Sequence, residues 1–390
     1  MVRPGLLYCR AMVKLWLSLV LSMATLGAQV EMRYADLSAP DGLRLKASYY
    51  SPGRPGPGVL LLHQCNRDRS VWNDLAMQLA ASGLHVLTFD YRGYGESQGE
   101  RHESLPPEKR AENAKHWPGD IDVAFQYLAT QPGVDKTRIG VGGASCGVDN
   151  AVQTARRHPE VKALMLLSGT TDEDGRAFLE ASDTLPVFIS ASDDDHDLLP
   201  YMTWLASFLH DERSELIACK GAGHGADMFK VEKSLPAKIV DFFDTTLIGP
   251  VPTGPRKASA ISPAVQFWDV LVGPKGPARA MKMLVQARKK DPNVSLFPES
   301  VVNLLGYDHL QKGDTKEAIE ILKLNEIAYP GSANVYDSLA DAYLADHRNK
   351  LALQYSEKCL EVLKANPPAD EVLARNIRGS AEAKIKKLKP

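Results

Sequence analysis

The chain has 390 residues, of which 44% are hydrophobic and 24% are charged, and its formal net charge is -2. This is ordinary globular composition, and the length is sufficient to bury at least one sizeable core. The small net charge gives no electrostatic case for nucleic acid or an anionic membrane surface as a partner, so neither is expected.

Residues 1–28 have the pattern of a secretory signal peptide. Basic residues precede a short apolar run at 15–24, and small residues follow it. The run is shorter than the about 20 residues that a membrane span needs. We therefore expect cleavage near residues 24–28 and an exported protein, periplasmic or secreted, with no stable membrane span. An uncleaved anchor is the alternative.

Residues 29–247 alternate short apolar runs with amphipathic stretches, which predicts an α/β domain. Buried strands are predicted at residues 58–62, 84–89, 138–142, 163–167, 187–189 and 215–218, and helices at 70–82, 120–130, 148–155 and 234–247. Residues 30–36 and 43–50 could form an antiparallel edge pair. Near-continuous apolar strands between helices indicate a doubly wound, mostly parallel sheet that is covered on both faces.

The remainder of the chain is predicted to be a linker followed by an all-α domain. Residues 248–261 are rich in proline and glycine, and residues 262–390 show helical patterning without strand runs. A period of about 34 residues aligns 303–306 with 337–340, which resembles tetratricopeptide repeats. About three units are needed for independent stability, so residues 263–291 supply an extra hairpin or the repeats pack on the first domain. Docking of a protein partner is one possible role of these repeats.

A G-x-S-x-G motif, residues 143–147, lies between the predicted strand at 138–142 and the predicted helix at 148–155. This is the strand-to-helix turn that exposes a nucleophilic serine. Ser145 is therefore the candidate nucleophile. Cys146 fits worse, because no glycine lies two residues before or after it.

A serine nucleophile needs a general base and a third group that orients the base. His224 lies between glycines after the last predicted strand, and His196 is its nearest rival. An acidic run follows the strand at 187–189, and there we place the orienting carboxylate at Asp195, with Asp194 as the alternative. A solvated turn or a cation site is the alternative for the rest of this run.

The developing oxyanion needs two preorganised donors. One is the backbone N–H of Cys146, and for the other we choose Cys65, with Gln64 as the alternative. Export would permit a disulfide between the two cysteines. The sequence favours two small buried thiols instead, because a bridge requires Cα atoms within about 7 Å of one another.

Residues 90–97 fit the pattern D-x-R-G-x-G-x-S, and residues 120–147 have the helix, turn and elbow of the α/β-hydrolase family. Together with the candidate serine, aspartate and histidine, these stretches make the chain resemble that family. Within that family it is similar to dienelactone-hydrolase-like and exported serine hydrolases over about residues 33–247. The resemblance implies a triad of Ser145, Asp195 and His224 that hydrolyses a small-molecule carboxylic ester or a related acyl bond, without cofactor or metal.

Three features bear on the pocket. Gln64 stands where glycine is common, and we expect its side chain to narrow the pocket. Only about 16 residues separate the strand ending near Ser168 from Leu185, so a small cap or none is expected. Residues 98–117 could supply pocket walls, but a solvated loop is favoured.

Other functions remain open on the sequence. A peptidase or an acyltransferase would use the same triad. A hydrolase fold could also serve as a non-catalytic scaffold, with the repeats binding a partner protein. Fold alone does not determine the substrate.

Overall fold

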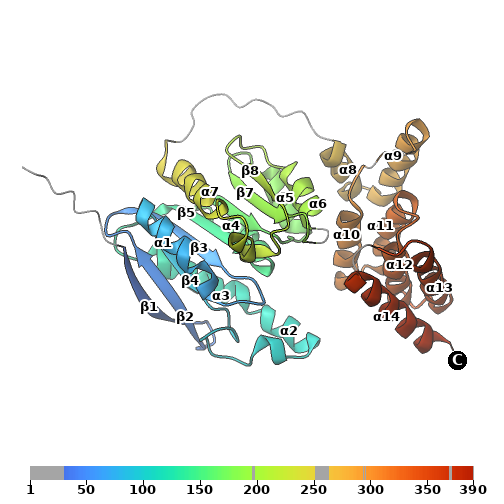
Figure 1. Ribbon diagram of the computed structural model, residues 1–390, viewed down its shortest axis with the longest axis horizontal. Coiled ribbons are helices and arrows are strands. Elements are labelled where there is room, and N and C mark those ends of the chain that lie inside the picture. The colour runs from blue at the N-terminus through green and yellow to red at the C-terminus, as the bar shows by residue number, and fades with distance from the viewer. Residues whose placement is uncertain are drawn as a thin grey trace, which may run out of the picture.

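The protein is described by a computed structural model over residues 30–195, 198–250, 263–292, 294, 296–368 and 371–389. The predicted signal peptide and most of the predicted linker lie outside the described residues, as does His196. The described chain forms an α/β part followed by a helical part (Figure 1).

The α/β part is built on one eight-stranded sheet, in the order β1-β2-β4-β3-β5-β6-β7-β8. Its strands are β1 (Glu31–Ser38), β2 (Arg44–Ser51), β3 (Gly56–Leu62), β4 (His85–Phe89), β5 (Val134–Ala144), β6 (Val161–Leu167), β7 (Val187–Ser192) and β8 (Glu215–Cys219). The first two strands form the predicted antiparallel edge pair, and β2 also runs antiparallel to β4. All pairs from β4 to β8 are parallel, which confirms the predicted fold class.

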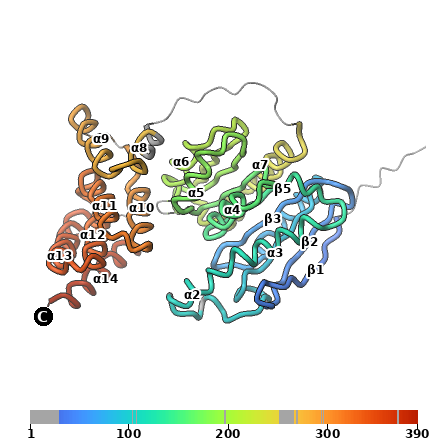
Figure 2. The backbone as a smooth tube through the Cα atoms, turned by 180° about the vertical axis from the view of Figure 1, so that it is seen from behind, coloured from blue at the N-terminus to red at the C-terminus, as the bar shows by residue number. Residues whose placement is uncertain are grey.

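Alternate side chains of the central strands enter two separate cores. In β3, Leu60 and Leu62 belong to one buried cluster and Val59 and Leu61 to the other, as the two-residue period of a strand requires. Helices pack on both faces: α1 (Asn73–Ser82) and α7 (Leu235–Phe243) lie on one, whereas α3 (Trp117–Ala129), α4 (Cys146–Arg157) and α6 (Leu198–Ala206) lie on the other (Figures 1 and 2). The sheet is therefore covered on both sides, and its parallel strands end at one shared edge.

Two shorter helices complete this part of the chain. Between β6 and β7 there is one helix, α5 (Glu173–Ala181), which agrees with the expected small cap or none. The segment 98–117, for which a solvated loop was favoured, contains a helix instead, α2 (Pro107–Ala114). Its residues are strong helix formers with proline at the first helical position, but they show no apolar stripe.

The helical part consists of antiparallel neighbours that repeat along the chain. Its helices are α8 (Pro263–Val272), α9 (Gly276–Lys290), α10 (Glu299–Lys312), α11 (Thr315–Ala328), α12 (Ala333–Ala345), α13 (Asn349–Ala365) and α14 (Glu371–Leu388). Helices α10 and α12 begin 34 residues apart, as do α11 and α13. The helices thus follow the predicted period, and α8 with α9 forms the extra hairpin. Their assignment to tetratricopeptide repeats stays a prediction.

The helical part packs on the α/β part through α5 and α6. Arg176 of α5, whose side chain is fully buried, pairs with Asp308 of α10 at 2.6 Å. Close by, Lys312 pairs with Glu173 at 2.8 Å. The buried apolar cluster on the α3–α4 face of the sheet continues into α8–α11. Two ways of stabilising the repeats were open on the sequence, an extra hairpin and packing on the first domain, and the fold contains both.

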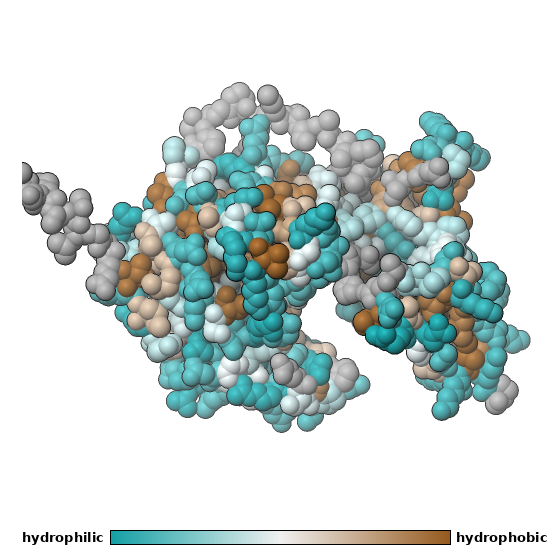
Figure 3. Space-filling model, in the orientation of Figure 1, coloured by the Kyte–Doolittle hydropathy of each residue, from teal (hydrophilic) through white to brown (hydrophobic). Residues whose placement is uncertain are grey.

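Hydrophilic residues cover most of the visible face of both parts, and apolar residues gather there in separate patches (Figure 3). Among the helices that the structure describes, none has both the length and the apolar composition to cross a bilayer.

Candidate active site

Ser145 occupies a sharp turn between β5 and α4. Its backbone has φ 54° and ψ -121°, a region that side-chain-bearing residues rarely adopt. A Cβ at Gly143 would overlap the carbonyl oxygen of Gly147, and a Cβ at Gly147 would meet the carbonyl oxygen of Leu62. Both motif glycines are therefore required by close backbone approach. The turn has the geometry of a nucleophile elbow, as the motif predicts.

His224 and Asp195 meet at the same edge of the sheet. His224 Nδ1 lies 2.9 Å and 3.0 Å from the two carboxylate oxygens of Asp195. Asp195 is 6% exposed, whereas the His224 side chain is 34% exposed. A buried carboxylate on Nδ1 orients the ring and leaves Nε2 available as a base.

The two preceding aspartates hold the backbone of the His224 loop. Asp193 accepts a hydrogen bond from the Gly221 amide at 2.8 Å, and Asp194 accepts one from the Gly223 amide at 3.0 Å. The Ser192 hydroxyl and the Gly223 amide hold the pKa of Asp194 below its usual range. The structure thus brings Asp195, and not Asp194, into contact with the imidazole. For the rest of the acidic run we expected a solvated turn or a cation site. Asp193 and Asp194 are exposed and hold the histidine loop through its backbone amides, and Asp197 lies outside the described residues.

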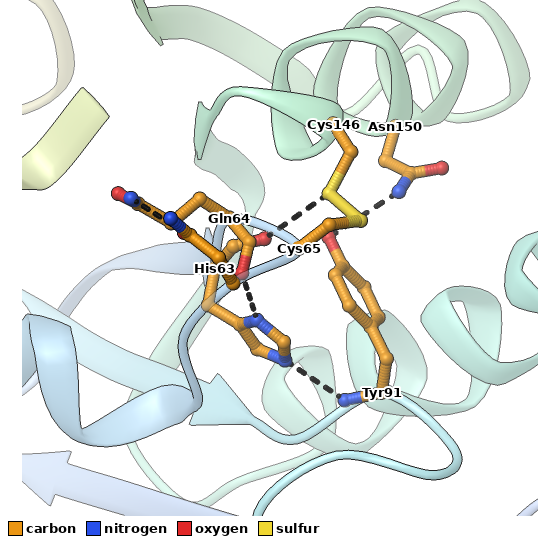
Figure 4. Close-up of a disulfide and its surroundings, with 7 residues drawn as sticks. His63, Gln64, Cys65, Tyr91, Cys146 and Asn150 are labelled. Atoms are coloured by element: carbon orange, nitrogen blue, oxygen red, sulfur yellow. Dashed lines mark hydrogen bonds between the residues drawn. A yellow bond between two sulfur atoms is a disulfide. The ribbon is translucent and has the colours of Figure 1, made fainter. Parts of the chain in front are cut away.

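Cys65 and Cys146, the two proposed oxyanion donors, are joined by a disulfide (Figure 4). Their Cα atoms are 5.9 Å apart, within the range for bridging. The interpretation of these residues as two free thiols is therefore wrong. It failed because 81 residues separate the cysteines in sequence, so their proximity depends on β3 and β5 pairing side by side. Each half of the disulfide follows one of these strands.

His63 fixes the loop that carries Cys65 (Figure 4). Its Nδ1 lies 2.9 Å from the Gln64 carbonyl oxygen, and its Nε2 accepts a hydrogen bond from the Tyr91 amide at 3.1 Å. Full burial lowers the pKa of His63, which favours the neutral ring that these two contacts need. His63 is not among the site residues that the sequence predicts. Its position directly after a buried strand and before Gln64 and Cys65 was the available signal.

Gln64 does not narrow the pocket, contrary to the expectation. Its side chain is buried; Oε1 accepts a hydrogen bond from the Ala226 amide at 2.9 Å, and Nε2 donates one to Asn66 at 2.9 Å. Gln64 thereby ties the loop after β3 to the segment that follows His224. The extra side chain connects two loops of the site.

A cavity of about 460 Å³ opens at Ser145 and His224. Its lining comes from the α2–α3 segment, the elbow and α4, the loop after β6, α6 and the histidine loop: Ala114, Trp117, Pro118, Ser145, Cys146, Asp149, Asn150, Gln153, Ser168, Gly169, Thr170, Leu198 and His224. Because Ala114 and Trp117 belong to it, the segment 98–117 does supply pocket wall. A cavity of this size suits a small-molecule ligand.

Within the described part of the chain, the hydrogen bonds do not include one from Ser145 Oγ to His224. Such catalytic hydrogen bonds are often long without substrate and tighten when it binds. What the structure brings together is Ser145 and His224 on one cavity, Asp195 behind the imidazole, and the Cys65–Cys146 pair beside the serine.

Residues 53–189 match the model of a family described as serine aminopeptidase, S33. An uncharacterised protein of Mycobacterium tuberculosis is 39% identical over 133 residues, which are 34% of this chain and 43% of that protein. The thiohydrolase aneE of Aspergillus aculeatus is 33% identical over 116 residues, which are 30% of this chain and 34% of that protein. The matched regions thus span less than half the length of these curated relatives.

Among solved structures, a cold-adapted esterase from an Arctic intertidal metagenomic library covers 56% of this chain and 94% of its own, at 21% identity and a TM-score of 0.46. The family match runs from β3 into the first half of β7 and includes the elbow, and it ends before Asp195 and His224. From the strand order, the elbow and this match, the part of the chain that carries the candidate site has the α/β-hydrolase fold.

Proposed function

We propose that the protein is a serine hydrolase that cleaves a carboxylic ester or a related acyl bond. Ser145 Oγ attacks the acyl carbon while His224 Nε2 takes its proton, and Asp195 orients the ring and stabilises its positive charge. The alcohol departs with that proton and leaves an acyl-enzyme on Ser145. Water, deprotonated by His224, then releases the acid and restores the serine.

The backbone amides of Cys65 and Cys146 are the proposed donors to the oxyanion in both steps. Their Cα separation of 5.9 Å allows two N–H groups to converge on one oxygen. Two converging donors stabilise charge that develops only in the transition state, and losing one costs about 2.7–4 kcal/mol.

One observation carries the proposal: a nucleophile elbow and a carboxylate-bound histidine open on the same cavity. A non-catalytic scaffold would not need the buried Asp195–His224 pair beside an elbow serine. The S33 family match and the thiohydrolase relative support acyl chemistry at this site.

The test is hydrolysis of short and long p-nitrophenyl esters by the mature protein and by Ser145→Ala. Turnover by the wild type that vanishes in the variant supports the serine mechanism, and the chain-length profile measures the acyl pocket. Absence of both turnover and fluorophosphonate labelling would favour the scaffold function instead.

Thioester cleavage and peptide-bond cleavage are the second candidates. The first is favoured by the 33% identical thiohydrolase and the second by the family description. To decide between them, kcat/KM is measured for acyl thioesters, aminoacyl p-nitroanilides and oxygen esters of equal acyl length. The bond type with the highest kcat/KM is the preferred one. Added alcohol or amine acceptors that divert product from acid would indicate acyl transfer.

Export and partner docking are further parts of the proposal. A disulfide beside the nucleophile suits an oxidising compartment, which supports export. The helical part is proposed to dock a protein partner with the surface that does not pack on α5 and α6. Cell fractionation of the full chain tests the location of the protein.

A further inference from the structure

We propose that Asp149 makes the cavity selective for substrates that carry a positive charge close to the scissile bond. This inference rests on the proposed serine hydrolase and names its substrate class: an acyl compound with an ammonium group. The inference starts from the observation that the Asp149 carboxylate and the candidate nucleophile Ser145 line the same cavity.

Asp149 lies in the first turn of α4, on the helix face that lines the cavity. Cys146, Asp149, Asn150 and Gln153 all belong to that lining, with the spacing of one helix face. Residues three apart on a helix have Cβ atoms separated by about 5–6 Å. A cation bound by Asp149 is therefore about one helical turn from the proposed donor at Cys146, which is the span of a choline ester.

The carboxylate is held in place while one oxygen stays free. Oδ1 accepts hydrogen bonds from the Thr171 hydroxyl at 2.8 Å, the Asp172 amide at 3.2 Å and the Gln153 side-chain amide at 3.2 Å. In the described part of the chain, Oδ2 has no hydrogen-bond partner. All three donors are neutral, so they orient the carboxylate without cancelling its charge.

No side chain with a permanent positive charge offsets the Asp149 carboxylate among the described residues that line the cavity. The carboxylate lies in the first turn of α4, where the partial positive charge of the helix N-terminus stabilises it. Among the described residues that line the cavity there is no lysine and no arginine, and His224 is assigned to catalysis. The Asp149 carboxylate would repel an anionic substrate, whereas a cation would gain one charge-assisted contact with it.

The test compares charged and neutral substrates of equal shape. One pair is acetylthiocholine and 3,3-dimethylbutyl thioacetate, with the charge on the leaving group. The other is p-nitrophenyl 4-(trimethylammonio)butanoate and p-nitrophenyl 5,5-dimethylhexanoate, with the charge on the acyl group. For each enzyme, kcat/KM for the cationic substrate is divided by kcat/KM for its neutral partner. The ratio of each variant is then compared with that of the wild type, so that differences in the intrinsic reactivity of the two substrates cancel.

In Asp149→Asn, which keeps the Oδ1 acceptor, we expect the ratio for at least one pair to fall about fivefold to tenfold, as for one partly exposed charged contact. Asp149→Glu keeps the charge and should retain most of the ratio. Asp172→Asn is the matched control: Asp172 shares the Gln153 amide and begins α5, but it does not line the cavity. Asparagine also caps helices well.

A ratio that stays within about twofold of the wild type in Asp149→Asn for both pairs overturns the inference. An equal fall of this ratio in Asp172→Asn overturns the inference too, because the effect would then come from the net charge of the surface and not from a contact with Asp149. If neither neutral nor cationic compounds are turned over and Ser145 is not labelled, the proposed function fails, and the inference fails with it.

Discussion

Removal of the Cys65–Cys146 disulfide should lower both stability and the rate of the chemical step. The perturbation is the Cys65→Ser/Cys146→Ser double variant, compared with wild type reduced by a phosphine. The bond closes a loop across 81 residues, for which the chain-entropy relation gives about 4.5 kcal/mol as an upper value. Measured losses are often smaller, since native geometry and residual structure in the unfolded chain intervene.

The catalytic effect has a separate origin. Each half of the disulfide is a proposed oxyanion donor, and the bond ties the loop after β3 to the start of α4. If its loss lets one amide turn away, kcat should fall by about 10²–10³, the effect of losing one donor. KM should change less, because the donor acts mainly in the transition state.

The assay is kcat for a p-nitrophenyl ester, normalised to folded protein, together with urea unfolding of the same samples. A Cys219→Ala/Cys359→Ala variant, which removes the two buried free cysteines of the described chain, is the control. It should keep wild-type sensitivity to the reductant. Reduced stability with an unchanged kcat would refute the catalytic reasoning and leave the bond as a purely structural cross-link.

Three further predictions follow from the site and its surroundings. Asp195→Asn should lower kcat by about 10⁴ because the imidazole loses its orienting carboxylate, whereas Asp194→Asn, which keeps an acceptor for the loop, should stay within about tenfold in the same ester assay. Asp308→Ala should lower the free energy of unfolding by about 3–5 kcal/mol in thermal or urea denaturation, because it removes the carboxylate that pairs at 2.6 Å with the buried guanidinium of Arg176; an effect below about 1 kcal/mol would contradict this. Burial lowers the pKa of His63, so below about pH 6.5 the unfolded chain binds a proton that the folded chain does not. The free energy of unfolding should therefore fall as the pH drops from 7 to 5.5, by at most about 1.4 kcal/mol per pH unit from this group. In His63→Asn, urea titrations should show a shallower dependence of this free energy on pH.

The sheet could be predicted well because its central strands are buried on both faces. The run at residues 58–62 lies inside β3 (Gly56–Leu62), and that at 163–167 lies inside β6 (Val161–Leu167). Residues 134–137 at the start of β5 are missed because 135–137 are polar and all four are exposed or only partly buried. Apolar periodicity reports burial, so it does not detect a strand end that extends beyond the covering helices.

The individual site residues could be selected from the sequence, but their contacts could not. Local spacing identified the elbow at Ser145 and the glycine-flanked His224. Which aspartate meets the imidazole depends on the turn of a loop, and the alternative, Asp194, faces the backbone amide of Gly223 instead. The disulfide depends on the pairing of two strands distant in sequence.

The environment of Asp149 is also long-range. Thr171, which donates to this carboxylate, has its carbonyl oxygen bound by Arg176 at 2.6 Å, and Arg176 pairs with Asp308 in the helical part. No periodicity or motif connects residues so far apart in the chain. The pocket wall and the helical part are therefore linked by contacts that only the fold reveals.

The most direct test of the central claim is to identify the residue that reacts with a fluorophosphonate, by mass spectrometry of the digested mature protein. The account predicts one adduct, on the peptide that carries Ser145, and no adduct in Ser145→Ala or in protein saturated with an ester that is turned over. Labelling of another residue, or an unlabelled Ser145 in folded protein with its disulfide intact, would contradict it.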